Sequence, residues 1–569
     1  MGILVSSIHV HGQDLEKIGK KDMLKVSGGL NYTSVLYNAS GIPDRRQPYT
    51  YFINGNITGN VLGITLPFNF SYSNNQLNYT QQYNIQSLNP TYKWIKGYAG
   101  ITSMNFSQYT MANHIFAGGG LELTPKNFKF AALYGRFKKA TEFDFENNSD
   151  VNMAYKRMGW GAYAGYEKNG HGIKLIYFSA KDDVRSLAFA PINTNITPME
   201  NTVVSIVGKT TLLKSLTFEA EYALSGLTRN LNSPADINSP SHNQLPLLFT
   251  PNATSQFFSA YKGSIGYRYK IFGINFNYER VNPDYKTLGA YYFNNDLENF
   301  TIAPAITLLK GKLNLSTNTG LQRNNLDNSK LNTTKRWVGS FNASYNPDQH
   351  WSLTGSYSNF SSFTKQRPQT DPFYRNTLDT LNFYQLSQNG MGSVSYSFGK
   401  TKHKHNIMFT GNYQVTGQDQ GAIADPGAFG TTANIKLPSR VTNLNAGHTI
   451  QLVKSKTAIN TVLNFNKSIL TGFNIVYYGP NINISQVFCK NLLRATIGSS
   501  YNQVLTNTIK TNEVFNHRLS LNCSPKMKNE KVGKFNLSLS ATYIQKLKTI
   551  ATAQAFNELT ANIGLNYNF

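Results

Sequence analysis

The stretch Ala555 to Phe569, AFNELTANIGLNYNF, ends the chain and decides how the rest of it is interpreted. Counting back from Phe569, every second residue is apolar or aromatic: Tyr567, Leu565, Ile563, Ala561 and Leu559. Asn, Thr and one Gly fill the alternate positions. A period of two residues predicts a β-strand with one apolar face and one polar face.

The same alternation recurs through the chain, for example at Phe272, Ile274 and Phe276, and again at Phe535 and Leu537. No charged residue falls on the apolar face of these segments, as expected for a face that meets lipid, where a midplane Lys or Arg costs roughly 2–4 kcal/mol. A soluble sandwich would instead bury this face in a core. Long strands and a persistent rhythm of strand, short turn, strand and long loop favour a membrane barrel.

Composition excludes a helical membrane protein. Only 15% of the 569 residues are charged, yet no apolar run approaches the roughly 18–20 residues of a spanning helix. Residues 1–12 are interpreted as the remnant of a signal peptide, with an ordinary disordered terminus as the alternative. Residues 13–22 are expected to form a short periplasmic leader, too short for the plug domain of a TonB-dependent transporter. The barrel is expected to span residues 23–569.

The predicted fold is an all-β, transmembrane antiparallel β-barrel of about 24 strands, within a range of 22–26. Both termini should lie on the periplasmic side, so the number of strands should be even. All candidate segments together would make about 25 strands. Treating Tyr92 to Phe106 as a folded loop leaves 24, and splitting a longer region gives 26. Residues 74–112 are therefore interpreted as a possible inward-folded plug segment.

The formal net charge of +25 raises the question of nucleic acid. The basic residues are not gathered in one arm or helix face, so no nucleic-acid partner is expected. Many fall in the expected short turns: Lys126, Lys129, Lys310, Lys312, Lys400, Lys402, Lys404, Lys454, Lys456, Lys526, Lys528, Lys531 and Lys534. They could form a basic periplasmic rim for an acidic protein partner or anionic lipid headgroups, or they could be simply solvated turns.

Four further charges fall on the predicted polar face of neighbouring strands: Glu219, Glu221, Arg268 and Lys270. Such lumen-facing charges could line a selective pore or pair across the strands. His403 and His405 flank Lys404 too sparsely to predict a metal site. Cys489 and Cys523 should lie two strands apart, too far for a disulfide. No catalytic or cofactor-binding motif is present, so the chain is expected to be no enzyme and to hold no cofactor.

The closing strand and the stretch PTYKWIKGYAGITSMNFSQYTMANHIFAGGGLELTP, residues 90–125, resemble large, uncharacterised outer-membrane β-barrel proteins of Bacteroidota. The resemblance implies an outer-membrane location and contact with outer-membrane lipid. It also implies that the barrel-closing strand, with Ile563, Leu565, Tyr567 and Phe569, is read by the barrel-assembly machinery. It supplies no specific function.

Two functions are compatible with these features. The first is a transport or secretion channel gated by inward loops. The second is a membrane-embedded scaffold that binds periplasmic or outer-membrane protein partners in a larger complex.

Overall fold

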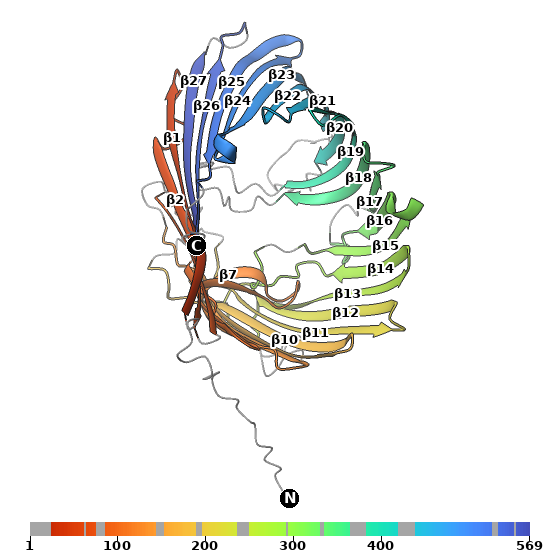
Figure 1. The fold of residues 1–569 in the computed structure, drawn as a ribbon. Helices are drawn as coiled ribbons and strands as arrows, with labels where there is room; N and C mark the ends of the chain where they lie inside the picture. Colours follow the sequence, from red (N-terminus) through yellow and green to blue (C-terminus); the bar gives the residue numbers. More distant parts are fainter. Residues whose placement is uncertain are drawn as a thin grey trace, which may run out of the picture.

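The fold is a single closed β-barrel, seen in a computed structural model (Figure 1). The structure describes residues 24–61, 64–74, 86–143, 153–188, 196–235, 250–291, 294–329, 335–364, 383–418, 439–470, 472–525, 533–550 and 554–569. The expected signal-peptide remnant and periplasmic leader lie outside these residues. So do Lys526, Lys528 and Lys531 of the predicted rim.

Alternating sequence patterns form the strands of the first half of the wall. Their bounds are β1 Leu24–Ser40, β2 Tyr49–Val61, β3 Ile64–Ser73, β4 Gln86–Leu88, β5 Thr91–Tyr92, β6 Ile95–Asn105, β7 Ala112–Leu123, β8 Phe128–Lys138, β9 Arg157–Lys168, β10 His171–Asp182, β11 Glu200–Leu212, β12 Leu216–Thr228, β13 Ser255–Tyr269 and β14 Phe272–Val281.

The second half continues in the same manner to the end of the chain. Its bounds are β15 Leu297–Leu308, β16 Leu313–Arg323, β17 Lys335–Tyr345, β18 Trp351–Thr364, β19 Phe383–Gly399, β20 His403–Gln418, β21 Ser439–Leu452, β22 Thr457–Leu470, β23 Phe473–Phe488, β24 Leu493–Thr506, β25 Ile509–Cys523, β26 Lys534–Lys546 and β27 Phe556–Asn568. Two 3-10 turns, Leu309–Gly311 and Cys489–Asn491, connect strands. Among the described residues, no helix is long and apolar enough to cross a membrane.

The sheet closes between its first and last strands. β27 pairs antiparallel with β1 from Gly29↔Asn568 to Ser40↔Asn557. Gly28 and Phe569 exchange two further backbone hydrogen bonds, of 2.9 and 3.0 Å. The predicted antiparallel, all-β barrel is therefore confirmed, and its wall has no free edge.

The wall has 26 strand positions. β4 and β5 both pair with β3 and with β6, so the 27 strands occupy 27 − 1 = 26 positions. The interruption falls at Asn89 and Pro90, and a proline has no N–H to give to a sheet ladder. The number is even and lies within the predicted range, but the preferred count of 24 is wrong.

Most of the described part of the expected plug segment lies in the wall. β6 belongs to the wall, because it pairs with β7 from Ile95↔Leu123 to Asn105↔Ala112. Of residues 74–112, only the connection 106–111 folds away from the wall, and residues 75–85 lie outside the described part of the chain. The short interrupted β4 and β5 carry too few alternating residues to be recognised in sequence.

One face of the strands is apolar and exposed around the barrel. Examples lie on strands far apart in the sequence: Tyr134 (62% exposed), Leu175 (57%), Leu321 (67%), Phe409 (58%) and Ile497 (63%). The opposite face carries the Asn, Ser, Thr, Lys and Glu side chains. An apolar outer face and a polar inner face are the arrangement of a membrane-spanning barrel.

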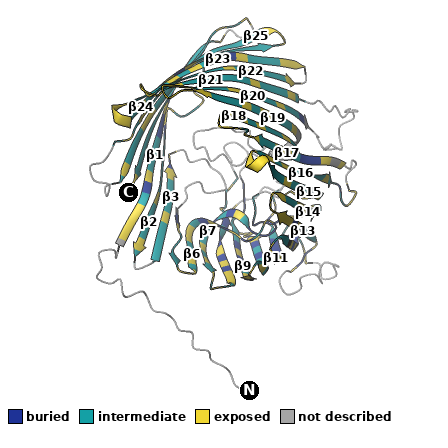
Figure 2. Ribbon diagram, turned by 45° about the vertical axis from the view of Figure 1, so that its right-hand side comes forward, coloured by how far each residue is buried: buried dark blue, intermediate teal, exposed yellow. Residues whose placement is uncertain are grey.

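The two ends of the barrel differ. At one end, called the turn end, lie the first and last residues of the sheet and the short connections such as 93–94, 213–215 and 400–402. At the other, called the loop end, lie the connections 41–48 and 106–111 and the described residues 139–143, 153–156, 282–291 and 294–296. Buried residues gather on β6 to β11, as Figure 2 shows. This marks the part of the wall that something covers from inside.

Candidate functional site

Two connections of the loop end cover the inner wall and form what we call the lumenal plug, residues 106–111 and 282–291. The first is a tight turn, closed by a hydrogen bond from Phe106 N to Met111 O of 2.9 Å and by a 2.8 Å hydrogen bond between the Ser107 and Thr110 hydroxyls. Tyr109, Thr110 and Met111 are fully buried. We place the plug inside the barrel, because the strands beneath it carry their exposed apolar side chains on the face opposite to the plug.

The two parts of the plug are joined to each other mainly through backbone atoms. The Tyr285 hydroxyl donates to Tyr109 O at 2.8 Å, and the Thr287 hydroxyl to Thr110 O at 2.5 Å. Ala112 N donates to Gly289 O at 2.9 Å. A Cβ atom at Gly289 would lie only 2.6 Å from Thr110 O, so the close approach requires glycine here.

Buried polar groups of the wall hold the second part of the plug. The Asn201 side chain on β11 accepts from Leu288 N at 3.0 Å and donates to Lys286 O at 3.3 Å. The Ser225 hydroxyl on β12 also donates to Lys286 O, at 2.6 Å. Asn201 and Ser225 are both fully buried. Their hydrogen bonds satisfy backbone groups that the plug would otherwise bury unpaired.

Apolar packing seals the plug against the wall. Phe106, Met111 and Leu288 from the plug form one buried cluster with inner-wall residues that include Phe116 on β7 and Phe178 on β10. Phe178 is 0% exposed. The inner wall beneath the plug is therefore buried like the core of a soluble protein.

Two plug residues, Gln108 and Tyr109, contact three charged residues of the wall, Glu221, Lys262 and Glu279. We call these five residues the latch. The Tyr109 hydroxyl donates to Glu279 Oε1 at 2.7 Å, and Lys262 Nζ lies 5.2 Å above the centre of the Tyr109 ring. Lys262 Nζ also lies 3.3 Å from Glu221 Oε2 and 3.3 Å from Gln108 Oε1. Burial, followed by the charge of Glu279, raises the pKa of the Tyr109 phenol well above its ordinary value, so Tyr109 acts as a donor.

The inner wall below the plug carries further half-buried polar contacts. Glu122 on β7 accepts hydrogen bonds from the hydroxyls of Tyr98 at 2.9 Å and Tyr163 at 3.1 Å. Lys174 on β10 donates to Phe106 O at 2.7 Å. The Lys174 contact joins the plug to β10, whereas the Glu122 contacts join β7 to β6 and β9. Among the described residues, no group of three His, Cys, Asp or Glu side chains is arranged to hold a metal ion.

The four predicted lumen charges do not form one cluster. Glu219, Glu221 and Arg268 share the inner face of β12 and β13, but the cross-strand partner of Glu221 is Lys262. Lys270 belongs to the β13–β14 turn, with its ammonium 5.1 Å above the outward Tyr269 ring. The sequence analysis missed Lys262, Glu279 and Tyr109, because choosing the partner of Glu221 requires the register of β12 against β13.

The inner face of β19 to β22, called the amide wall, is different. Asn412 donates to Asn389, Asn443 to Asn412 at 3.4 Å, and Asn466 to Asn443, which makes a ladder of amides across four strands. Asn445 and Asn460 donate to threonine hydroxyls on neighbouring strands. Amide and hydroxyl groups therefore dominate this part of the inner wall.

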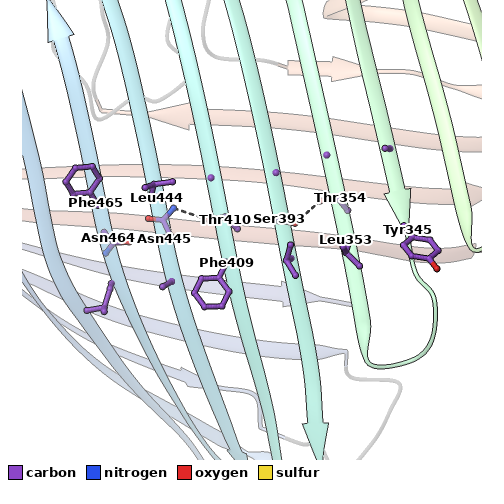
Figure 3. A pocket seen from close by; sticks show the side chains of 17 residues that line it. Tyr345, Leu353, Thr354, Ser393, Phe409, Thr410, Leu444, Asn445, Asn464 and Phe465 are labelled. Carbon is purple, nitrogen blue, oxygen red and sulfur yellow. Dashed lines mark hydrogen bonds between the residues drawn. The ribbon is translucent and has the colours of Figure 1, made fainter.

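The outer face of β17 to β22 is hollowed by a concavity of about 730 Å³ (Figure 3). Gly355, Gly392 and Gly411 lie side by side across three strands at its floor, because they pair in register. Phe409 and Leu444 rise beside them. The hollow arises from missing side chains on the apolar face and belongs to the lipid-facing surface.

Lysines occupy the turn end, where the sequence analysis expected a basic rim. Lys310 and Lys312 lie in the β15–β16 turn, and Lys400 and Lys402 lie in the β19–β20 turn. Lys404 is the second residue of β20 and shares the face of Asn406. Cys489 and Cys523 are both free thiols.

No family model and no curated protein matches this chain. Similar solved structures include the siderophore receptor PirA from Acinetobacter baumannii, at TM-score 0.40 and 9% identity over 96% of this chain and 80% of that chain. Others are the outer membrane protein OpdK from Pseudomonas aeruginosa (0.30, 7%, 66% and 94%) and OccAB4 from A. baumannii (0.30, 10%, 72% and 98%). Similarities this distant assign neither a family nor an activity, and membership of a Bacteroidota family stays a prediction.

Proposed function

We propose that this protein is a transport channel of the bacterial outer membrane, gated by the lumenal plug. Four features of the wall support the location: closure, an apolar outer face, an even number of strands, and short turns at one end with longer loops at the other. Barrels of 16–18 strands enclose an aqueous channel and those of 22 are plugged, so a lumen bounded by 26 strands needs a closing element.

The observation that carries the gating is the register of the latch. Lys262 is the direct cross-strand neighbour of Glu221 on one side and of Glu279 on the other. When Tyr109 leaves, Lys262 stays the direct cross-strand neighbour of both carboxylates, so each keeps a cation beside it, although one positive charge then faces two negative charges. Release of the plug therefore leaves neither carboxylate without a neighbouring cation, which favours a reversible gate.

The shape of the plug supports the same role. Each of its two parts is a connection tethered to the ends of wall strands, so both can move while the sheet stays paired. A contact that opens locally, below the free energy of global unfolding, is typical of lids and gates.

Single-channel recording in planar bilayers tests the proposal. Replacing residues 107–110 by two glycines should raise the mean conductance, because the turn that carries Tyr109 is removed. The matched control shortens the connection 547–550 at the same end, where Ile550 is 97% exposed, and should leave the conductance unchanged. Equal conductance of the plug variant and the wild-type protein would overturn the gating.

A further inference from the structure

Several lysines at the turn end have a backbone conformation that is unusual for lysine. Seven of them have a positive φ, between 47° and 61°: Lys93, Lys126, Lys214, Lys270, Lys310, Lys456 and Lys490. Glycine, asparagine and aspartate suit this left-handed conformation, whereas a long side chain is disfavoured there. Lysine at these positions is therefore not explained by the folding of the turns.

The loop end shows what the same backbone conformation normally selects. Its positive-φ residues other than glycine are Asn113, Asp284, Asp296, Asn325, Asn328, Asn507 and Thr508. Asparagine and aspartate dominate at this end, and lysine is absent from these described positions. The turn end also has Asn169, Leu213, Leu309, Cys489 and Asn491 in this conformation, so what distinguishes it from the loop end is the presence of lysine.

The lysines in the described turns of the turn end, which we call the basic rim, have few acidic neighbours: Asp348 lies near Lys312, and the pair of Lys129 with Glu167 lies on β8 and β9, outside the rim. The rim consists of Lys93, Lys126, Lys214, Lys270, Lys310, Lys312, Lys400, Lys402, Lys454, Lys456 and Lys490, all exposed. Within the residues that the structure describes, none of them forms an ion pair. The acid of the described turns, Asp348, accepts backbone hydrogen bonds from His350 and Trp351.

Apolar side chains stand directly beside the rim lysines. Leu213 precedes Lys214 and is 91% exposed, Ile271 follows Lys270, and Leu309 precedes Lys310. Exposed aromatic side chains, including Tyr269 and Trp351, lie on the outer face just above them. An aromatic belt with cations at its edge is the arrangement of a protein surface at the boundary of lipid tails and headgroups.

We propose that the basic rim binds the phosphate groups of anionic phospholipids in the leaflet that surrounds the turn end. Lysines occur in connections from β5–β6 around to β23–β24, so they face the lipid on many sides of the barrel. A protein partner would engage one arc. The proposal rests on the membrane-spanning wall and is independent of the plug, so the two can fail separately.

Quenching of Trp351 by brominated lipids measures this binding in the full-length protein. Trp351 begins β18, beside the turns that carry Lys310, Lys312 and Lys400. With the other three tryptophans replaced by Phe, quenching by brominated phosphatidylglycerol and by brominated phosphatidylcholine gives the relative affinity at the turn end. We expect a preference for phosphatidylglycerol of about tenfold at low salt, decreasing as salt is added.

The test variant combines Lys310→Asn, Lys312→Gln and Lys400→Gln, and should reduce the preference to less than about twofold. Asn suits the backbone conformation at position 310, so folding should be retained. Replacing the same three lysines by Arg should keep the preference. The matched control removes Lys139, Lys156 and Lys335 at the loop end and should change nothing at Trp351.

Two results would overturn the proposal. One is equal quenching of Trp351 by the two lipids in the protein that keeps all lysines of the basic rim. The other is a preference that survives removal of the three lysines. If polyglutamate binds to the wild-type protein but not to the variant, while the lipid preference is absent, the rim belongs to an acidic protein partner and the lipid assignment is wrong.

Discussion

The inner faces of β10 and β21 carry different side chains because different surroundings cover them. On β10, Ile176, Phe178 and Ala180 are each at most 1% exposed and pack under the lumenal plug. On β21, Asn443 and Asn445 are half-buried and hydrogen-bonded sideways to their neighbours. One half of the wall is thus stabilised by packing against a third layer, and the other by polar ladders within a single layer.

This difference indicates which part of the wall is affected when the plug moves. Removing the plug exposes apolar inner wall only on the side of β7 to β14, so the free energy of opening is set there. The amide wall keeps the same hydrogen bonds whether the plug is in place or not, because they run between adjacent strands.

The largest effect should come from truncating the packed side. Phe178→Ala should lower the free energy of unfolding by about 3–5 kcal/mol, since the ring is fully buried between plug and wall. Val462→Ala, on the inner face of the amide wall, should lower it by no more than about 1 kcal/mol. Guanidinium unfolding in lipid vesicles measures both. Equal losses would show that the two halves are packed alike.

A smaller effect is expected from adding one methyl group where the two parts of the plug meet. Gly289→Ala places a Cβ 2.6 Å from Thr110 O and 2.9 Å from the Phe178 ring, so the plug must shift. We expect a loss of about 1–3 kcal/mol in the free energy of unfolding.

Gly355→Ala is the matched control, because nothing lies within 4 Å of its added Cβ. It should change the free energy of unfolding by less than about 0.5 kcal/mol. Thermal unfolding of both variants measures the two changes. If Gly289→Ala left the free energy of unfolding unchanged, the contact between the two parts of the plug would be loose.

The smallest effect belongs to the amide wall. Asn443→Ala removes a link between Asn412 and Asn466 and should lower the free energy of unfolding by about 1 kcal/mol. A double-mutant cycle with Asn466→Ala should show coupling. The same cycle with the distant Asn562→Ala should be additive within about 0.5 kcal/mol. Additivity in both cycles would show that the amides of the ladder do not stabilise this half of the barrel through one another.

The sequence predicted the wall where alternation is undisturbed, and failed where a third layer covers the inner face. β14 alternates Phe272, Ile274 and Phe276 with Gly and Asn, so its outer face was evident. In β10, by contrast, Leu175, Ile176, Tyr177 and Phe178 follow one another without alternation. Such a run indicates a strand that is covered on both faces, and it was the available signal for the plug.

The candidate site was harder to predict, because the contacts between its residues depend on the register of neighbouring strands and on loops that are far apart in the sequence. Glu221 was placed on the polar face, but Arg268 lies six residues from Lys262 along β13, roughly 20 Å at the rise of a strand. The meeting of Tyr109 with Glu279 joins segments 170 residues apart. Alternation within single strands holds no information on either contact.

The seam between β1 and β27 has a consequence for how the chain reaches its fold. The buried contact from the Tyr37 hydroxyl to Glu558 Oε1, at 2.5 Å, joins residues separated by 521 positions. Every other neighbouring pair of wall strands joins segments that follow one another closely in the sequence, whereas this pair joins the first strand to the last. Until this pair forms, both strand edges stay open to pairing with other chains. Pairing of the last strand with the first therefore determines when the assembling sheet loses its open edges and can no longer pair with other chains.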